Sequence, residues 1–232
     1  MDKKEKHVYK VFQSIAGGYD KANDRISTGL HLRWKKAGLK ALAKKLPEGG
    51  SLLDMGCGTG DIIRLIKEQR PDCKAVGVDF SPKMLEVAGK NLKGIPGVRL
   101  ERGNVTRLNY EDGSFDAVTI SFALRNTSDY GRVLGEAFRL LKPNGYFMCI
   151  DSFVPESPVI RPFYNLYFNL LMPFIGGGIH KHRQYKWLSK STKSFISAGE
   201  LEGLMKKKGF CKIRSGGFLF GACVCIMGNK KK

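Results

Sequence analysis

From Ser51 onward, short apolar runs alternate with stretches of helical periodicity, and this alternation constrains the fold more than any other feature of the chain. It is typical of βαβ units around a parallel sheet. A terminal hairpin is predicted from Lys212–Gly216 and Phe218–Met227. We therefore predict an α/β protein with a mostly parallel central sheet and flanking helices. The predicted strands are Ser51–Asp54, Ala75–Asp79, Val98–Glu101, Phe115–Ser121 and Tyr146–Ile150, and the predicted helices are Asp61–Gln69, one that begins at Ser81-Pro82, Tyr130–Leu141 and Glu200–Lys208.

The length of 232 residues favours a single domain, 1–232. Two segments fall outside the alternating pattern. Residues 1–47 are helical and basic, and we expect them to form an N-terminal cover. Residues 154–197 are aromatic and marked by Pro and Gly, and we expect a lid insertion there. Both segments are candidates for covering an active site.

The charge balance is strongly basic, with 40 Lys plus Arg against 21 Asp plus Glu and a net charge of +19. This excess favours an anionic partner, which can be nucleic acid, an acidic membrane surface or a phosphorylated substrate. The charged N-terminus shows no secretory h-region, so we expect a cytoplasmic protein. The most apolar stretch, Pro158–Ile175, is interrupted by Arg, Asn and Pro and is too broken to span a bilayer.

The cysteines lie mostly alone in apolar, strand-like sequence, which predicts reduced thiols in the core. Cys223 and Cys225 share one strand face, but no second pair or histidine cluster accompanies them, so we expect no metal site. The other cysteines are Cys57, Cys73, Cys149 and Cys211.

A glycine-rich loop, Gly56-Cys57-Gly58-Thr59-Gly60, follows the first predicted strand and opens a helix. Glycines let the backbone approach a ligand closely, and the helix N-terminus faces that ligand. Dinucleotide-binding loops have the spacing G-x-G-x-x-G, whereas Gly60 comes one residue early. The acidic Asp54 at the strand end would repel a phosphate. The loop therefore favours a cationic ligand, bound by Asp54, Gly56, Gly58 and Thr59.

Asp79 ends the next predicted strand and is placed to accept two hydrogen bonds from a ribose diol. Together with the glycine loop it predicts S-adenosylmethionine as the cofactor. At this point the chain resembles the class I S-adenosylmethionine-dependent methyltransferases. Gly103-Asn104-Val105 resembles the segment that reads adenine, and Ser121 takes the position that faces the methyl donor. The resemblance implies a Rossmann-like class I methyltransferase fold, with Asn104, Val105 and Ser121 as cofactor contacts.

Three methylation chemistries are disfavoured by what the sequence lacks. The Asn/Asp-Pro-Pro-aromatic run of planar-nitrogen methyltransferases is absent after the fourth predicted strand. No cysteine nucleophile stands where pyrimidine C5 methylation needs one, and no Cys-x-x-x-Cys-x-x-Cys supports radical chemistry. A polar methyl transfer to an electron-rich atom remains.

Residues Tyr19–Trp34 resemble the Tyr-Asp-x-Met-Asn … Ser … His-x-x-Trp signature of the ubiquinone and menaquinone biosynthesis C-methyltransferases, and Ile120–Asn126 resembles their Ser-Phe-Gly-Leu-Arg-Asn block. Tyr185–Leu188 also fits their pattern. Ala22 and Ala123 depart from this pattern, as do Asp151-Ser152-Phe153 and the C-terminal residues Ser215–Gly228.

This resemblance implies methylation of a ring carbon in a reduced, prenylated quinone. Arg125 would stabilise the phenolate that forms, and Asn126 would orient the ring oxygens. Tyr19 with Asp20 would close the N-terminal segment over the cofactor. His31 would anchor this segment, with a catalytic base role as the alternative.

The apolar segment Pro158–Ile175 has two interpretations. It either packs in the core or forms a lid that receives a prenyl chain. Basic clusters such as Lys35-Lys36, His180–Arg183 and Lys206–Lys208 would suit anionic lipid headgroups. We therefore expect peripheral membrane association, whereas nucleic acid is disfavoured because no binding motif is present. A homodimer is compatible with the sequence. Two alternatives stay open, namely a phospholipid-amine N-methyltransferase and a nucleic-acid-binding protein with a vestigial cofactor site.

Overall fold

The computed structural model describes residues 3–168, 172, 175, 187 and 189–231. Within them one sheet has the strand order β3-β2-β1-β4-β5-β7-β6. Strands β1 to β5 pair in parallel, and β7 is antiparallel to both β5 and β6. This confirms the mostly parallel sheet and the terminal hairpin. The strands are β1 (Ser51–Met55), β2 (Lys74–Asp79), β3 (Val98–Arg102), β4 (Phe115–Ser121), β5 (Leu141–Ser152), β6 (Phe210–Phe218) and β7 (Cys223–Lys230).

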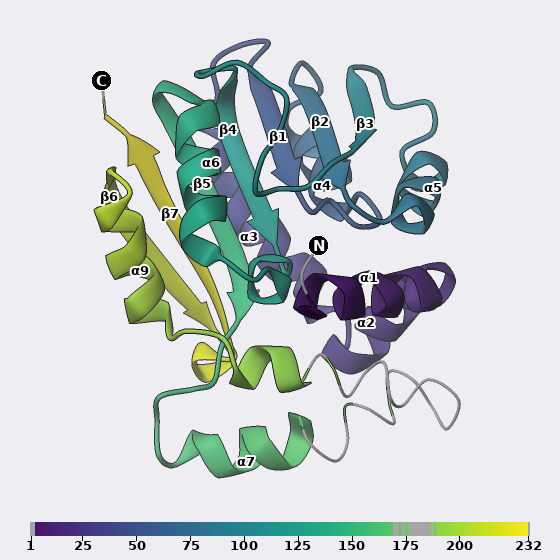
Figure 1. Cartoon of the computed structure of the whole chain (residues 1–232), viewed down its shortest axis with the longest axis vertical. Coiled ribbons are helices and arrows are strands. Elements are labelled where there is room, and N and C mark those ends of the chain that lie inside the picture. Colours follow the sequence, from purple (N-terminus) through teal and green to yellow (C-terminus); the bar gives the residue numbers. More distant parts are fainter. Residues whose placement is uncertain (1–2, 169–171, 173–174, 176–186, 188, 232) are drawn as a thin grey trace.

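Helices cover both faces of the sheet, which explains why its central strands read as continuous apolar runs. Apolar side chains of α3 (Leu30–Ala43) and α4 (Asp61–Gln69) share one core cluster with β1 and β5. Those of α6 (Tyr130–Leu140) and α9 (Ala198–Lys207) share another cluster with β4, β5 and β7. Helix α5 (Pro82–Asn91) packs beside β2 and β3 (Figure 1).

Local signals in the sequence set several helix starts. Ser81 caps α5, since its side chain accepts a hydrogen bond from the Met84 amide at 3.2 Å. Ser197 and Glu200 form a capping box at the start of α9. Helix α4 has the bounds that the pattern predicted.

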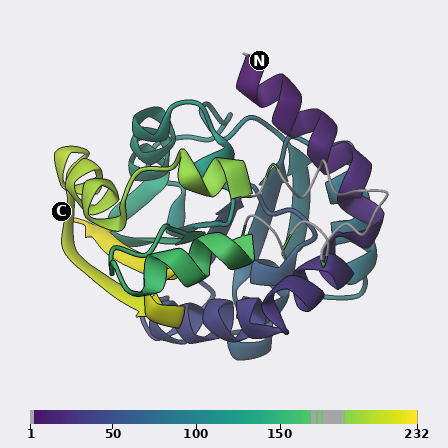
Figure 2. The ribbon, with the colours of Figure 1, turned by 90° about the horizontal axis from the view of Figure 1, so that it is seen from below.

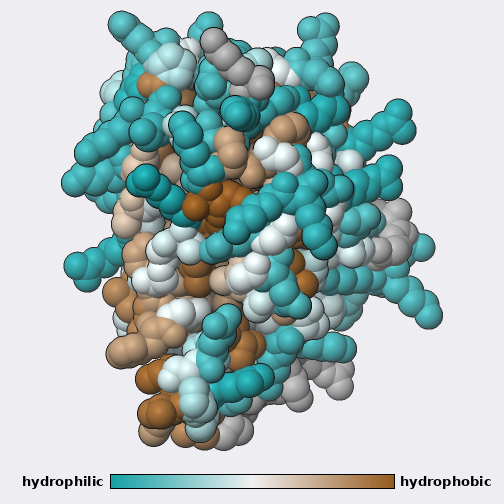
Figure 3. Space-filling view, turned by 90° about the vertical axis from the view of Figure 1, so that its left-hand side faces the viewer, coloured by the Kyte–Doolittle hydropathy of each residue, from teal (hydrophilic) through white to brown (hydrophobic). Residues whose placement is uncertain are grey.

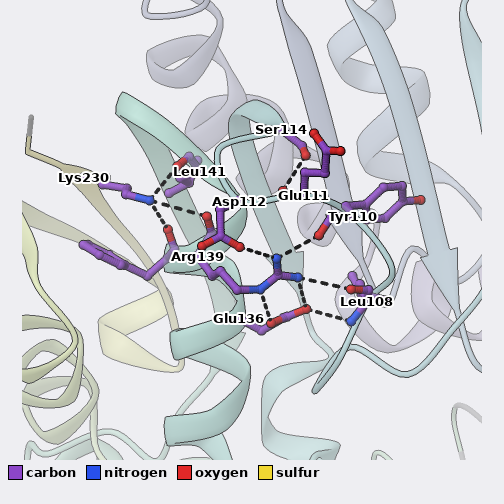
Figure 4. A network of polar contacts seen from close by, with 10 residues as sticks. Leu108, Tyr110, Glu111, Asp112, Ser114, Glu136, Arg139, Leu141 and Lys230 are labelled. Atoms are coloured by element: carbon purple, nitrogen blue, oxygen red, sulfur yellow. Dashed lines mark hydrogen bonds and ion pairs between the residues drawn. The ribbon is translucent and has the colours of Figure 1, made fainter.

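The helix predicted over Tyr130–Leu141 ends one residue earlier, and the strand predicted over Tyr146–Ile150 is longer at both ends. Strand β5 begins at Leu141, directly after α6, and Asn144 takes a left-handed φ of 65° inside it. Lys230 of β7 explains the abrupt helix end, because its Nζ donates to the carbonyls of Phe138 (2.9 Å) and Leu141 (2.8 Å) (Figure 4). A lysine thus satisfies backbone acceptors at this helix end.

Arg139 of α6 holds the chain between β3 and β4 in place (Figure 4). Its guanidinium donates to the Leu108 and Tyr110 carbonyls at 3.1 and 2.8 Å, and it pairs with Glu136 and Asp112. This connection begins with residues 103–105, so the network fixes one end of a segment that was predicted to touch the cofactor.

The N-terminal helices α1 (Lys3–Ile15) and α2 (Tyr19–Ser27) lie beneath the carboxyl ends of the parallel strands (Figure 1). Seen from below, they share this end of the molecule with α7 (Ile160–Leu166) (Figure 2). The segment predicted as a lid, 154–197, lies partly outside the described residues. The basic cluster at 180–183 lies wholly outside them, and of residues 185–188 only Trp187 is described. No helix in the described part of the chain is long and apolar enough to cross a membrane.

The cysteines are free thiols, as predicted, and all but Cys211 are buried. Burial raises the pKa of the Cys149 thiol well above its ordinary value. Among the described residues no group of three or more His, Cys, Asp or Glu side chains is placed to hold a metal ion.

Candidate active site

A cavity of about 380 Å³ lies between the carboxyl ends of β1, β2 and β4 and helix α1. All the residues predicted to bind cofactor line it, together with two of the three predicted to be catalytic. Only Arg125 lies elsewhere. The predicted residues that line the cavity are Tyr19, Asp54, Gly56, Gly58, Thr59, Asp79, Asn104, Val105, Ser121 and Asn126.

The glycine loop has the backbone geometry that its sequence predicts. Gly56 and Gly58 have φ values of 73° and 54°, a region that side chains rarely adopt. A Cβ on Gly56 would lie 2.7 Å from the Cβ of Ala123, whereas a Cβ on Gly58 would meet no atom within 4 Å. The backbone at Gly58 therefore borders open space, which permits close approach of a ligand.

Asp54 is a buried acid at the cavity wall. The Thr119 hydroxyl donates to its Oδ1 at 2.8 Å. Burial raises the pKa of Asp54 to about 7, against the opposing effects of the Thr119 hydrogen bond and the Lys35 charge. A carboxyl group in this state favours a cationic ligand, because a nearby positive charge restores its ionised form.

We expect cofactor affinity to depend on pH through Asp54. Its pKa of about 7 in the free protein falls when a cation binds, so binding releases a proton below pH 7 and affinity rises with pH until about 8. The affinity at pH 6 should be about 10-fold lower than at pH 8. Isothermal titration in buffers of different ionisation enthalpy measures both effects. Asp54→Asn should lose this dependence while keeping any titration of the ligand, and an unchanged pH profile in that variant would refute the assignment.

Asp79 organises the next part of the cavity. Its Oδ2 accepts from the Gly58 amide at 2.9 Å and its Oδ1 from the Ser81 amide at 2.8 Å. Burial raises the pKa of Asp79 while these amides lower it. Each carboxylate oxygen keeps capacity for a second hydrogen bond, as recognition of a diol requires.

The Asn104 side chain is held within its own loop. Its Oδ1 accepts from both the amide and the hydroxyl of Thr106, at 3.0 and 2.9 Å. These bonds fix the loop at the cavity wall, which Asn104 and Val105 both line, and the contact with adenine stays a prediction. Nothing in the sequence signalled this turn-forming use.

Ser121 ends β4 with a hydroxyl oxygen that is buried and has no hydrogen-bond partner in the described structure. A buried hydroxyl without a partner is costly unless a ligand satisfies it. Phe122 follows with a φ of 53°, a strained conformation for a bulky residue at the same wall. Both features point to a ligand at this place.

Asp20 joins the N-terminal helix α2 to the glycine loop. Its Oδ1 accepts from the Thr59 hydroxyl at 2.6 Å, and its Oδ2 accepts from the Asn91 amide at 3.2 Å. Tyr19, the preceding residue, lines the cavity and packs edge-on against Phe12. Asn91, which also donates to the Thr59 carbonyl at 3.0 Å, was missed by sequence reasoning because only the fold brings it here.

A second cavity of about 360 Å³ adjoins the first and shares Tyr19 and Phe122 with it. Its described walls are largely apolar and carry no acidic side chain. They are formed by Tyr19, Asn23, Ile26, Ser27, Thr28, Leu30, His31, Trp34, Phe122, Arg125, Ser152, Tyr167, Phe168, Met172, Thr192, Leu219 and Ala222.

Arg125 lies in this second cavity and forms a buried ion pair. Its guanidinium and its backbone amide both donate to the Asp151 carboxylate. The Asp151 charge raises the pKa of Arg125 against the effect of burial. The Nε of Arg125 is buried without a partner in the described structure. Sequence reasoning missed Asp151, since only the pairing of β4 with β5 brings it beside Arg125.

Asn126 and His31 are both held by neighbouring side chains. The Asn126 side chain donates to the Phe122 carbonyl at 3.3 Å and accepts from the Trp187 ring nitrogen at 3.2 Å. His31 Nδ1 lies 2.7 Å from the Ser27 hydroxyl, which ties α2 to α3. Burial lowers the pKa of His31, which favours its neutral form.

The first cavity fits S-adenosylmethionine by its donors and acceptors. Asp54 offers an acid near the glycine loop, where a cationic group can bind. Asp79 offers two oxygens at the end of β2, and Ser121 offers an unpartnered hydroxyl at the end of β4. Gly58 leaves room for the ligand beside the backbone.

Comparisons with known proteins agree with this geometry. The model of the ubiE/COQ5 methyltransferase family matches residues 1–230. The chain is 38% identical to the demethylmenaquinone methyltransferase of Listeria monocytogenes serotype 4b over 99% of this chain and 98% of the relative. It is also 38% identical to that of Staphylococcus aureus strain JH9, over 98% and 95%.

Among solved structures, the fold is similar to a Thermotoga maritima protein described as a SAM-dependent methyltransferase, possible histamine N-methyltransferase. The TM-score is 0.67 at 25% identity, with 96% of this chain and 100% of that chain covered. The cavity, the family match and this likeness assign S-adenosylmethionine as the cofactor. The chain belongs to the ubiE/COQ5 methyltransferase family and is an S-adenosylmethionine-dependent methyltransferase.

Proposed function

We propose that this methyltransferase methylates a ring carbon of a reduced, prenylated quinone of the demethylmenaquinol type. The observation that carries the proposal is the second cavity, an apolar space beside the cofactor cavity that contains one buried guanidinium. The relatives named demethylmenaquinone methyltransferase support the same acceptor.

The chemistry of the acceptor matches these walls. A quinol hydroxyl next to the target carbon pushes electron density onto it as the hydroxyl loses its proton. The carbon then bonds to the methyl group while the sulfur–methyl bond breaks, and the ring proton leaves to restore aromaticity. The bound cofactor supplies the activated methyl group. The protein aligns the acceptor, excludes water and stabilises the developing phenolate.

Arg125 is the group proposed to stabilise that phenolate. Its pairing with Asp151 fixes the guanidinium, and its unpartnered Nε leaves a donor for an oxyanion. Tyr19 and Phe122 stand where the two cavities meet, at the boundary between cofactor and acceptor. Asn126, held by Trp187, would position a ring oxygen from its place in the first cavity. Residues 1–47 would cover the reaction, together with the residues of 154–197 that line the second cavity, which are Tyr167, Phe168, Met172 and Thr192.

A phospholipid amine fits the second cavity less well. The described walls include aromatic rings, but they also hold the Arg125 guanidinium and no acidic side chain that would offset its repulsion of an ammonium group. Like charges in a low-dielectric space repel strongly. This electrostatic difference favours an acceptor that develops negative charge.

The test compares both acceptors with a trideuteriomethyl-labelled donor under anaerobic, reducing conditions. We expect mass spectrometry to find the label on a ring carbon of a prenylated demethylquinol. Phosphatidylethanolamine in the same vesicles should stay unlabelled. Labelling of the lipid amine instead of the quinol would overturn the proposal.

A further inference from the structure

Five large apolar side chains project into solvent at the lower end of the molecule. We call Val159, Phe163, Leu166, Leu219 and Phe220 the apolar tip. Phe163 and Phe220 are 70% and 74% exposed, and the other three are at least half exposed. They come from α7 with its preceding residue and from η4 (Leu219–Gly221), which joins β6 to β7.

The parts of the apolar tip lie side by side. Figures 1 and 2 place the β6–β7 connection next to α7 from two directions. Figure 3 shows hydrophobic residues gathered at the lower end of the face that contains this edge of the sheet. Exposed apolar groups in a cluster mark a surface that meets an apolar partner.

The β6–β7 connection holds two of these residues in an unfavourable backbone conformation. Leu219 and Phe220 have φ values of 48° and 54°, in the left-handed region that bulky residues avoid. Strain that leaves large apolar side chains in water brings no benefit to folding, so it suggests a role outside the folded core.

The apolar tip also borders the mouth of the second cavity. Leu219 lines that cavity and is 53% exposed, so it lies where the cavity meets solvent. Thr192 lines the same cavity between Lys190 and Lys193, which are both exposed. The neighbourhood therefore combines an apolar surface with cations, on a chain whose net charge is +19.

We propose that the apolar tip inserts into the surface of an anionic phospholipid bilayer and gives a prenyl chain a path from the bilayer into the second cavity. Apolar side chains would enter the boundary of the acyl chains while the nearby lysines face lipid phosphates. The delivery role rests on the proposed function, whereas the insertion of the tip does not.

Insertion is tested by placing a fluorophore in the tip. In Phe220→Trp, the added tryptophan should be quenched by vesicles of brominated phosphatidylglycerol and phosphatidylcholine, beyond the background from Trp34 and Trp187 measured in wild type. The control Glu111→Trp places tryptophan at an exposed site near the amino end of β4, opposite the tip, and should show no added quenching. Equal quenching in both variants, or none in Phe220→Trp, would overturn the proposal.

Delivery is tested with Phe163→Ser/Phe220→Ser, which changes neither cavity's lining. Flotation with anionic vesicles should show binding at least about 10-fold weaker than wild type. Turnover of a long-chain demethylquinol in vesicles should fall with it, while turnover of a short-chain, water-soluble demethylquinol should stay at the wild-type rate. Unchanged vesicle binding and turnover in the double variant would refute the role of the apolar tip but not the proposed function. Absence of turnover of both quinols by wild type would refute the proposed function.

Discussion

Replacing Arg125 by alanine should lower kcat for quinol methylation by about 100-fold or more, the scale expected for loss of one oxyanion-type donor. Cofactor affinity should stay nearly unchanged, because Arg125 lines the second cavity and not the first. Stopped-time assays with a demethylquinol give kcat and KM, and calorimetry gives cofactor affinity.

The ion pair requires controls for folding. Removal of Arg125 leaves Asp151 buried without its partner, which costs about 3 to 5 kcal/mol in such pairs. The double variant Arg125→Ala/Asp151→Asn removes both charges and should recover stability but not turnover. Arg125→Lys should recover turnover only partly, since lysine keeps the charge and loses the planar fork. Wild-type kcat in the folded double variant would show that Arg125 is structural.

Replacing Asp79 by alanine should weaken cofactor binding by about 1.5 to 3 kcal/mol, which is about 10- to 150-fold. Two losses contribute. The carboxylate no longer meets the ribose diol, and the Gly58 and Ser81 amides lose their acceptor. Calorimetry with S-adenosylmethionine measures the effect directly.

Asp116→Ala is the matched control for Asp79→Ala. Asp116 lies on β4 at the opposite end of the sheet, where it pairs with Lys142 at 2.9 Å and accepts from the Ser51 amide at 2.8 Å. Its loss should change stability and leave cofactor affinity as in wild type. Equal affinity losses in both variants would mean that Asp79 acts through general destabilisation.

Much of the fold follows from local chemistry that the sequence displays. Strand β4 has its predicted bounds because it is a short and mostly apolar run, and helix α4 has its own because it is an amphipathic run directly after the glycine loop. The predicted start of the fifth strand at Tyr146 was too late, because β5 begins at Leu141, directly after α6, where the distant Lys230 binds the carbonyls of Phe138 and Leu141. A contact between residues so far apart in the chain leaves no signal in the local sequence.

The cofactor cavity was predictable for the same reason. Gly56 and Gly58 follow the end of β1 and Asp79 is the last residue of β2, and parallel strands bring their carboxyl ends to one edge. The second cavity was not predictable from spacing, because its walls come from α2, α3, β5 and the β6–β7 connection. Asp151, the partner of Arg125, could be found only once the order of the strands was known. Residues 169–171, 173–174, 176–186 and 188 of the predicted lid lie outside the described structure.

The most direct test of quinol methylation is mass spectrometry of quinones extracted from cells with and without the gene. The account predicts that cells without it accumulate a quinone one methyl group lighter on the ring, and that the wild-type gene restores the methylated form while the Arg125→Ala/Asp151→Asn gene does not. An unchanged quinone profile in cells that lack the gene would contradict the account.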